Sequence, residues 1–264
     1  MMTPSLTLIK ETAALRQKKG REERGLILVE GRHPIEEALR AGLQLKSIFL
    51  LPTHPGHLPA AQYPIAPYVV DESTMRRICS TDSPPPCLAV FERPVPPGQF
   101  LGTLALVLDG VQDPGNLGTL IRSALAFGVD GVILVGEMVE PYNPKVIRAS
   151  AGLVFGLSVF CVEPSALVGL LSAPDWKIYA TTGHAGALSY RDVDYTGRCA
   201  IVLGNEGRGV SADLLVDRPQ QALTIPMAAA VESLNVAISG SIILAQAAAQ
   251  RGLLDVGNPV LADA

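Results

Sequence analysis

Three segments of the sequence place glycines and polar side chains directly after apolar runs that are typical of buried strands. They are residues 108–122, 203–210 and 225–236. In α/β sheets, ligands bind at the carboxyl ends of the strands, where such segments lie. Glycines there let backbone N–H groups approach a ligand closely, and polar side chains can orient a reacting group. We therefore expect these three segments to hold the functional residues.

Each segment taken alone also fits an ordinary structural role. In the first, Asp113-Pro-Gly predicts a turn, Asn116 is placed to cap the next helix, and Arg122 projects from that helix. The second has neither the GxGxxG dinucleotide pattern nor the GK[ST] ending of a phosphate-binding loop. In the third, Ser233 fits a helix N-cap, whereas Asn235 has low helix propensity and is less well explained.

Strands and helices alternate regularly after residue 100. Strands are predicted at residues 103–108, 131–135, 158–162, 177–181, 199–203 and 222–225, and helices at 117–127 and 234–250. Continuous apolar strands that alternate with helices predict a parallel sheet covered on both faces. The pattern alone indicates an ordinary doubly wound sheet, because true knots are essentially absent from proteins.

A smaller α/β region precedes a Pro/Gly-rich stretch at residues 93–100, which is typical of an extended linker. Its predicted strands are residues 26–29, 47–51, 67–70 and 88–91, and its predicted helices are residues 34–42 and 71–78. The chain therefore divides into two regions, of which only the second contains the three segments.

In this order, the three segments resemble the motifs of the SpoU/TrmH family of RNA 2′-O-methyltransferases, within the SPOUT superfamily. The matching stretches are DPGNLGTLIRSA, GNEGRG and IPMAAAVESLNVA, and residues 141–152 between them match as well. Residues 21–39 resemble the L30-like substrate-binding domain of many family members that modify ribosomal RNA. One departure is Ala229, where the family usually has glycine.

The resemblance implies an L30-like RNA-binding domain at residues 1–95 and a methyltransferase domain at residues 96–264. The fold class is α/β, and the C-terminal segment of the parallel sheet would form a trefoil knot. Family members are homodimers through the C-terminal domain and bind S-adenosyl-L-methionine (AdoMet) in the knotted loops. The residues that would line the cofactor site here are Thr181, Leu203, Gly204, Asn205, Ile225, Met227 and Leu234.

The resemblance also assigns five polar residues to the reaction, namely Asn116, Arg122, Glu206, Ser233 and Asn235. The reaction would be an in-line methyl transfer to a ribose 2′-hydroxyl. Because a guanidinium stays protonated in proteins, we expect Arg122 to stabilise the developing alkoxide rather than act as a base. Asn116, Ser233 and Asn235 would orient the ribose and the loops, and Glu206 is either structural or catalytic.

Charge is unevenly distributed. The net charge is −4, but residues 1–48 carry +3 and the rest of the chain carries −7. A basic region on an acidic body is typical of a protein that contacts a phosphate backbone, although a solvated helix surface explains it equally well. The residues that we expect to contact RNA are Arg16, Lys18, Lys19, Arg21, Arg24 and Arg32.

Composition excludes several classes. A hydrophobic share of 48% with 17% charged residues indicates a globular chain rather than a disordered one. We expect no membrane span, no export signal and no metal site, and reduced core cysteines in a cytoplasmic protein. The substrate expected from the resemblance is ribosomal RNA, 23S above all. The alternatives are a tRNA methyltransferase, a non-catalytic RNA-binding protein on this fold and a Rossmann-type nucleotide enzyme, although the last lacks its GxGxxG pattern.

Overall fold

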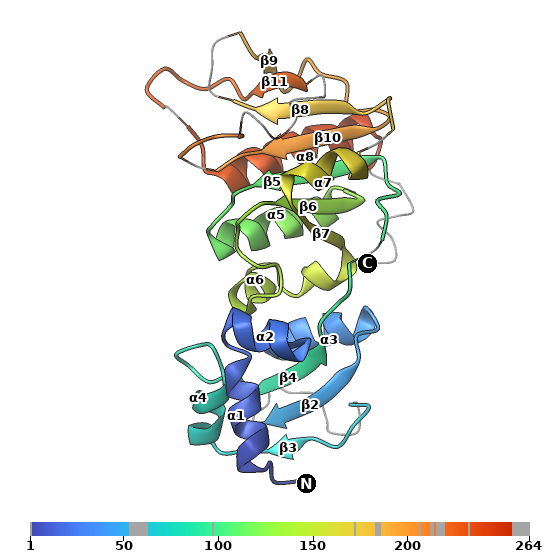
Figure 1. The fold of residues 1–264 in the computed structure, drawn as a ribbon. Helices are drawn as coiled ribbons and strands as arrows, with labels where there is room; N and C mark the ends of the chain where they lie inside the picture. The colour runs from blue at the N-terminus through green and yellow to red at the C-terminus, as the bar shows by residue number, and fades with distance from the viewer. Residues whose placement is uncertain are drawn as a thin grey trace. The chain divides into compact units, whose positions relative to one another are not determined.

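The computed structural model consists of two compact units (Figure 1). The first comprises Met1–Val95 together with Glu140–Gly156, and the second comprises Pro96–Val139 and Leu157–Ala264. The residues that the structure describes are 2–52, 63–96, 98–171, 173–182, 186–205, 207–211, 214, 220–231 and 233–254.

The first unit is built on a four-stranded mixed sheet in the order β1-β4-β2-β3. β4 runs antiparallel to both of its neighbours, and β3 is parallel to β2. All four predicted strands are present, as β1 (Leu26–Glu30), β2 (Leu45–Leu50), β3 (Tyr68–Val69) and β4 (Cys87–Glu92). Both predicted helices are present too, as α3 (Arg32–Arg40) and α4 (Glu72–Ile78).

Two further helices precede β1, α1 (Leu6–Ala14) and α2 (Lys18–Arg24). Ser5 caps α1 by accepting a hydrogen bond from the Leu8 N–H, and Gly25 ends α2 in the left-handed conformation at φ 61°. The apolar side of α1 packs over the sheet, where Ile9 and Leu15 join a core with Leu28, Phe49 and Leu88.

The segment between β6 and β7 of the second unit packs within the first unit. It holds α6 (Pro144–Ala149), capped by Asn143, and the short 3-10 helix η2 (Leu153–Gly156). Gly152 has φ +83°, and a Cβ there would lie 2.8 Å from the Cα of Pro34 on α3. Only glycine permits this close approach, which places residues of the 141–152 match against α3.

The second unit is a seven-stranded sheet in the order β7-β6-β5-β10-β8-β11-β9, and every pairing in it is parallel. The predicted strands are β5 (Leu104–Asp109), β6 (Gly131–Val135), β7 (Ser158–Val162), β8 (Lys177–Thr181), β10 (Cys199–Leu203) and β11 (Gln220–Thr224). The short edge strand β9 (Leu188–Ser189) is additional. Every residue of β5, β6 and β10 is buried, as expected for central parallel strands.

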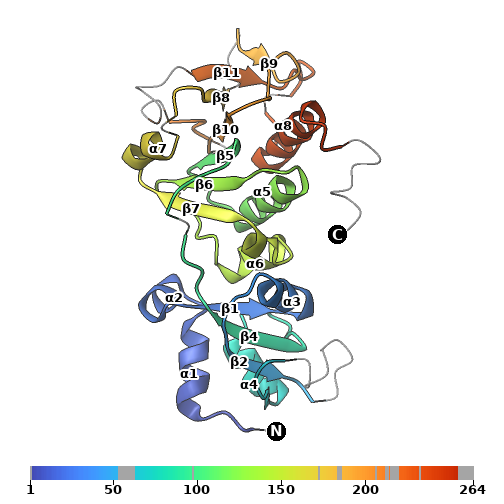
Figure 2. The ribbon, with the colours of Figure 1, turned by 90° about the vertical axis from the view of Figure 1, so that its right-hand side faces the viewer.

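Helices cover both faces of this sheet, which confirms the predicted architecture. Figure 2 shows α5 (Pro114–Ala126) and α8 (Val236–Gln250) on one face and α7 (Pro164–Leu170) on the other. α5 and α8 pack closely at Gly240, where only glycine fits, since a Cβ there would lie 2.4 Å from the Leu120 side chain of α5. The hydroxyls of Ser123 and Ser241 join the two helices at 2.7 Å.

All four cysteines are unbridged, and three of them are buried as expected. Cys161 is exposed, so the expectation of a core position is wrong for this cysteine. Burial raises the pKa of the Cys87 and Cys199 thiols to about 12, so neither supplies a thiolate near neutral pH. Within the described part of the chain, no group of three His, Cys, Asp or Glu side chains is placed to hold a metal ion. No helix among the described residues is long and apolar enough to cross a membrane.

Candidate functional site

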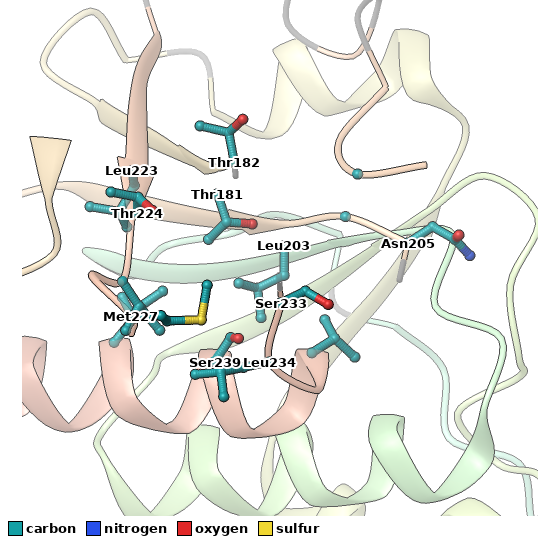
Figure 3. A pocket seen from close by; sticks show the side chains of 15 residues that line it. Thr181, Thr182, Leu203, Asn205, Leu223, Thr224, Met227, Ser233, Leu234 and Ser239 are labelled. Carbon is teal, nitrogen blue, oxygen red and sulfur yellow. The ribbon is translucent and has the colours of Figure 1, made fainter. Parts of the chain in front are cut away.

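A cavity of about 170 Å³ lies in the second unit where the ends of β8, β10 and β11 meet the start of α8 (Figure 3). Because β8, β10 and β11 are neighbouring parallel strands, their carboxyl ends share one edge of the sheet. The loops after β10 and β11 are the second and third segments singled out from the sequence. The sheet topology therefore brings segments that are some twenty residues apart in the chain to one cavity.

All seven residues expected to line a cofactor site do line this cavity, and Ser233 from the catalytic set lies with them. Sequence reasoning missed seven others, namely Thr182, Gly209, Leu223, Thr224, Val236, Ser239 and Ile243. Thr182 and Thr224 end or follow strands, so their position at the carboxyl edge was a usable signal. Ser239 lies one helical turn beyond Asn235 on α8, which the helix period predicts to be the same side.

The cavity combines apolar walls with hydroxyl groups. Leu203, Leu223 and Ile243 supply apolar surface, whereas Thr182, Thr224, Ser233 and Ser239 supply hydroxyls. The Thr181 hydroxyl already donates a hydrogen bond to the Val202 carbonyl, at 3.2 Å, so its proton is not available to a ligand. No Asp, Glu, Lys or Arg is among the described residues that line it. Such a lining suits a ligand that has an apolar ring and hydroxyl groups.

The second segment forms a closed loop that holds one wall of the cavity. Asn205 and Gly209 exchange two backbone hydrogen bonds of 2.9 and 3.1 Å. The Asn205 side chain donates to the Gly110 carbonyl at 2.9 Å and accepts from the Gly207 N–H at 2.9 Å. Asn205 thus ties this loop to the one after β5, so its amide positions the wall in addition to lining it.

Glycine is required at the start of this loop. A Cβ at Gly204 would lie 2.1 Å from the carbonyl carbon of Gly209, which is backbone and has no room to move aside. Gly209 itself has φ +71°, where side chains are strained. Glu206 belongs to the same segment, but it lies outside the described residues, so its proposed role stays a prediction.

A hydrogen bond joins the first and third segments beside the cavity. Asn235 donates through Nδ2 to Oδ1 of Asn116 at 3.0 Å. Its own Oδ1 accepts from the N–H groups of Ala237 and Ile238, at 2.9 and 3.3 Å, and so caps α8. Since Asn235 stands between Leu234 and Val236, both of which line the cavity, the pair lies at the cavity edge.

Two of the capping assignments from sequence are wrong. The N-cap of α8 is Asn235 rather than Ser233, because the helix begins two residues later than predicted. The N-cap of α5 is Asp113, whose carboxylate accepts from the Asn116 N–H at 2.8 Å. Asn116 is therefore inside the first turn of α5, and its side chain is directed to Asn235 instead of to a backbone cap.

Arg122 stands apart from this pair. It is exposed on α5, and the structure gives it no ion pair or hydrogen bond with any described residue. It is also not among the described residues that line the cavity. An exposed guanidinium with its donors unused is available for an external anion.

Arg21, one of the residues expected to contact RNA, is buried instead. It is 1% exposed, and its guanidinium binds Glu140 and the backbone carbonyls of Leu15 and Arg16. Because these groups occupy the donors, Arg21 does not reach a phosphate, and its assignment is wrong. Arg16, Lys18, Lys19, Arg24 and Arg32 are all exposed. Lys18, Lys19 and Arg32 form helical ion pairs with Glu22, Glu23 and Glu36, and Arg24 also pairs with Glu23.

Known proteins resemble this chain over nearly its whole length. The 23S rRNA (guanosine(2553)-2′-O)-methyltransferase RlmP of Bacillus subtilis (strain 168) is 34% identical over 239 residues, which span 89% of this chain and 94% of that protein. A crystal structure of an AdoMet-bound rRNA methyltransferase from Sinorhizobium meliloti has a TM-score of 0.80 at 31% identity, and it covers 96% of this chain and 98% of its own.

A third relative is the SpoU methyltransferase AviRb from Streptomyces viridochromogenes in complex with AdoMet. Its TM-score is 0.79 at 25% identity, covering 92% of this chain and 98% of that one. The family model for the MRM3-like substrate binding domain matches residues 7–89, and that for the SpoU rRNA methylase family matches residues 103–245. With the three segments gathered at one cavity and relatives that match both regions, the chain belongs to the SpoU rRNA methylase family.

Proposed function

We propose that this chain transfers a methyl group from AdoMet to a ribose 2′-hydroxyl of ribosomal RNA. The observation that carries the proposal is the convergence of the three segments. Two of them build the cavity, and the Asn116–Asn235 hydrogen bond brings the first to its edge. A ligand in the cavity and a second ligand at the asparagine pair would lie side by side, as group transfer requires.

The residues of the cavity fit AdoMet. The apolar walls suit the adenine ring, and the hydroxyls and the backbone of the loops suit the ribose and the amino-acid part. The absence of an acidic or basic side chain from the described lining leaves the sulfonium without a strong counter-charge. When bound, AdoMet supplies a methyl group that its positive sulfur makes electrophilic.

The chain's own residues then act on the acceptor ribose. Arg122, which pairs with no described residue, would bind the 2′-oxygen as that oxygen gives its proton to solvent water and takes the methyl group, whose bond to sulfur breaks to leave a neutral thioether. Arg122 would also bind the neighbouring phosphate. Asn116 and Asn235 orient the ribose, since their mutual hydrogen bond fixes both amides. Ser233 lines the cavity. Glu206, which lies outside the described residues, keeps its expected role as a positioning or catalytic group.

Several finer assignments belong to the same proposal. RlmP, the RlmB of Xanthomonas campestris and a uridine 2′-O-methyltransferase of Streptomyces viridochromogenes carry names that specify 23S rRNA, which makes it the preferred substrate. Ile238 on α8 and Val231 before it are 52% and 45% exposed, which favours a homodimer that covers them. We further propose that residues 1–95 bind the RNA, that residues 96–264 form the methyltransferase domain with its knot, and that the enzyme is cytoplasmic.

The test uses the full chain and ribosomal RNA from cells in which its gene has been deleted. The protein is incubated with AdoMet that carries a tritiated methyl group, and the labelled nucleotide is mapped by nuclease digestion. We expect label on one ribose in 23S rRNA, and calorimetry should show binding of AdoMet in preference to NAD or ATP.

Three other outcomes have defined meanings. Label on tRNA alone would show that tRNA, rather than ribosomal RNA, is the substrate. RNA binding and AdoMet binding without transfer would indicate a non-catalytic RNA-binding protein. Heat of binding with NAD or ATP but none with saturating AdoMet would overturn the cofactor assignment.

A further inference from the structure

The first unit contains a second cavity, of about 310 Å³, lined by residues of α1 and of the sheet. All of its lining residues fall between positions 8 and 90, so it shares none with the cavity of the second unit. Its volume is in the range of about 300–1,000 Å³ that is usual for small-ligand sites. Leu8, Leu15, Leu26 and Val90 supply apolar walls that suit a flat ring.

Two buried hydroxyls in this cavity have no partner within the described chain. Thr12 on α1 is 2% exposed and Ser47 on β2 is 4% exposed, and both line the cavity. Neither side chain makes a hydrogen bond with any residue that the structure describes, and neither is among the described polar atoms that are fully buried without a partner. Both hydroxyls therefore remain accessible from the cavity, where a ligand with polar edges would bind them.

An aromatic ring and charged side chains complete the lining. Tyr68 lines the cavity, and stacking on Phe49 fixes the orientation of its ring, with ring centroids 5.5 Å apart and an interplanar angle of 24°. Arg24 and Lys46 lie at the rim, and their side chains are 36% and 40% exposed. Their ion pairs with Glu23 and Glu92 are at the surface, where such pairs are weak and readily exchanged for a phosphate.

Glu11 adds an acceptor at the same rim, since its exposed carboxylate forms no ion pair with a described residue. A carboxylate accepts hydrogen bonds from the N–H groups on the edge of a nucleobase. Apolar walls, an aromatic ring, two hydroxyls and flanking cations are together the groups that recognise an unstacked base and its phosphate. A purely apolar ligand would leave both hydroxyls unsatisfied.

We propose that this cavity binds one unpaired nucleobase of the RNA substrate, with the adjoining phosphate at Arg24 and Lys46. The inference rests on the proposed function for the identity of the RNA. It deepens that function, because a site for one base in the first unit would add a sequence requirement to the RNA that the enzyme accepts. Selection of the substrate then depends on a single-stranded nucleotide in that RNA.

Thr12→Val, Ser47→Ala and Tyr68→Leu test this inference in the full chain. The valine and alanine variants remove only unsatisfied hydroxyls, so they should fold, and thermal denaturation checks this. Each should weaken binding to ribosomal RNA by roughly 3- to 10-fold, and loss of the Tyr68 ring should weaken it about tenfold or more. The matched control is Ser73→Ala, which removes an exposed hydroxyl of α4 bonded to Asp71.

The readouts separate this inference from the proposed function. RNA affinity is measured by fluorescence anisotropy without AdoMet, and KM for RNA, kcat and AdoMet affinity are measured separately. We expect only RNA affinity and KM to change, and ultraviolet crosslinks to unmodified ribosomal RNA to fall on the peptide that contains Tyr68. Unchanged RNA affinity in all three variants, in a wild type that methylates RNA, overturns the cavity assignment alone. Cavity-dependent RNA binding without any methyl transfer overturns the enzymatic function alone.

Discussion

The two units use their charged side chains in opposite ways. In the first unit, Arg21 and Glu140 are buried together with side chains 2% and 4% exposed, and Arg93 lies 3.6 Å from the second carboxylate oxygen of Glu140. Glu30, 1% exposed, accepts from Arg148 and from the Ser80 hydroxyl. In the second unit, the cavity lining is uncharged across its described residues, and Arg122 is exposed with its donors unused.

This difference teaches how to distinguish structural from reactive arginines. A buried guanidinium whose three nitrogens all donate within the protein holds the fold together and is not accessible to a substrate. An exposed guanidinium that pairs with no described residue can bind an anion. By type and sequence context, Arg21 and Arg122 both resembled candidate anion ligands. Burial excludes Arg21 from that role, and Arg122 stays a proposed anion ligand.

The largest effect is expected from Arg122→Ala. It should lower kcat by about 10³-fold, the upper end for loss of one donor at a developing oxyanion, while AdoMet affinity stays unchanged. Arg122→Lys should rescue little, because a point charge does not reproduce a planar fork of donors. Single-turnover methylation and calorimetry measure the two quantities. Turnover near the wild-type rate in the alanine variant would remove Arg122 from the reaction.

The matching change in the first unit should act on stability instead. Arg21→Met leaves Glu140 charged and buried, which typically costs about 3–5 kcal/mol of unfolding free energy. The double variant Arg21→Met with Glu140→Leu removes both charges and should recover a large part of that loss. Urea denaturation of the full chain measures both. A single variant as stable as the wild type would mean that the buried pair contributes nothing.

Asn235 combines both kinds of role, and two substitutions separate them. Asn235→Asp keeps an oxygen to cap α8 but loses the Nδ2 donor to Asn116, so stability should hold while kcat falls about 10- to 100-fold. Asn235→Ala should lose the same activity and a further ~1 kcal/mol of stability with the cap. Equal activity in the aspartate variant and the wild type would show that the Asn116 hydrogen bond is dispensable.

The sequence allowed most of the architecture to be predicted. Buried parallel strands read as continuous apolar runs, so β5, β6 and β10 were identified within a residue or two of their ends. The short β9 has too few residues to produce a pattern, and the knot stays a prediction that rests on the family resemblance. The placement of residues 140–156 within the first unit depends on long-range ion pairs such as Arg148–Glu30, which no local pattern reveals.

The membership of the candidate site was predictable only in part, and its geometry was not. Gly204 and Ile225 were identified from the resemblance of their segments to the family motifs, and the sheet topology brings them to the same cavity. The helix caps at Asp113 and Asn235 were not identified, because capping depends on where a helix begins, and helix ends vary by one or two residues. Arg21 was misassigned because a basic residue in a basic stretch carries no sign of its own burial.

The smallest effect is expected from the exposed basic residues of the first unit. Replacing Arg16, Lys18 and Lys19 by Ala should leave stability nearly unchanged, since they are exposed and Ala is a good helix former. If each contacts one phosphate, the slope of log K for RNA against log salt should become shallower by roughly 0.7–0.9 per residue. The control is Arg76→Ala, which removes an exposed cation of α4 paired with Glu72.

Filter binding at four or five salt concentrations gives both slopes. A shallower slope in the triple variant, with an unchanged one in Arg76→Ala, would show that these cations contact phosphate. The exposed cations would then pair with phosphates of the RNA, whereas the buried Arg21 pairs with the carboxylate of Glu140. Equal slopes of log K against log salt for the wild type and the triple variant would mean that RNA contacts other residues of the first unit. Arg24 and Lys46 at the rim of the second cavity would then be the next cations to replace.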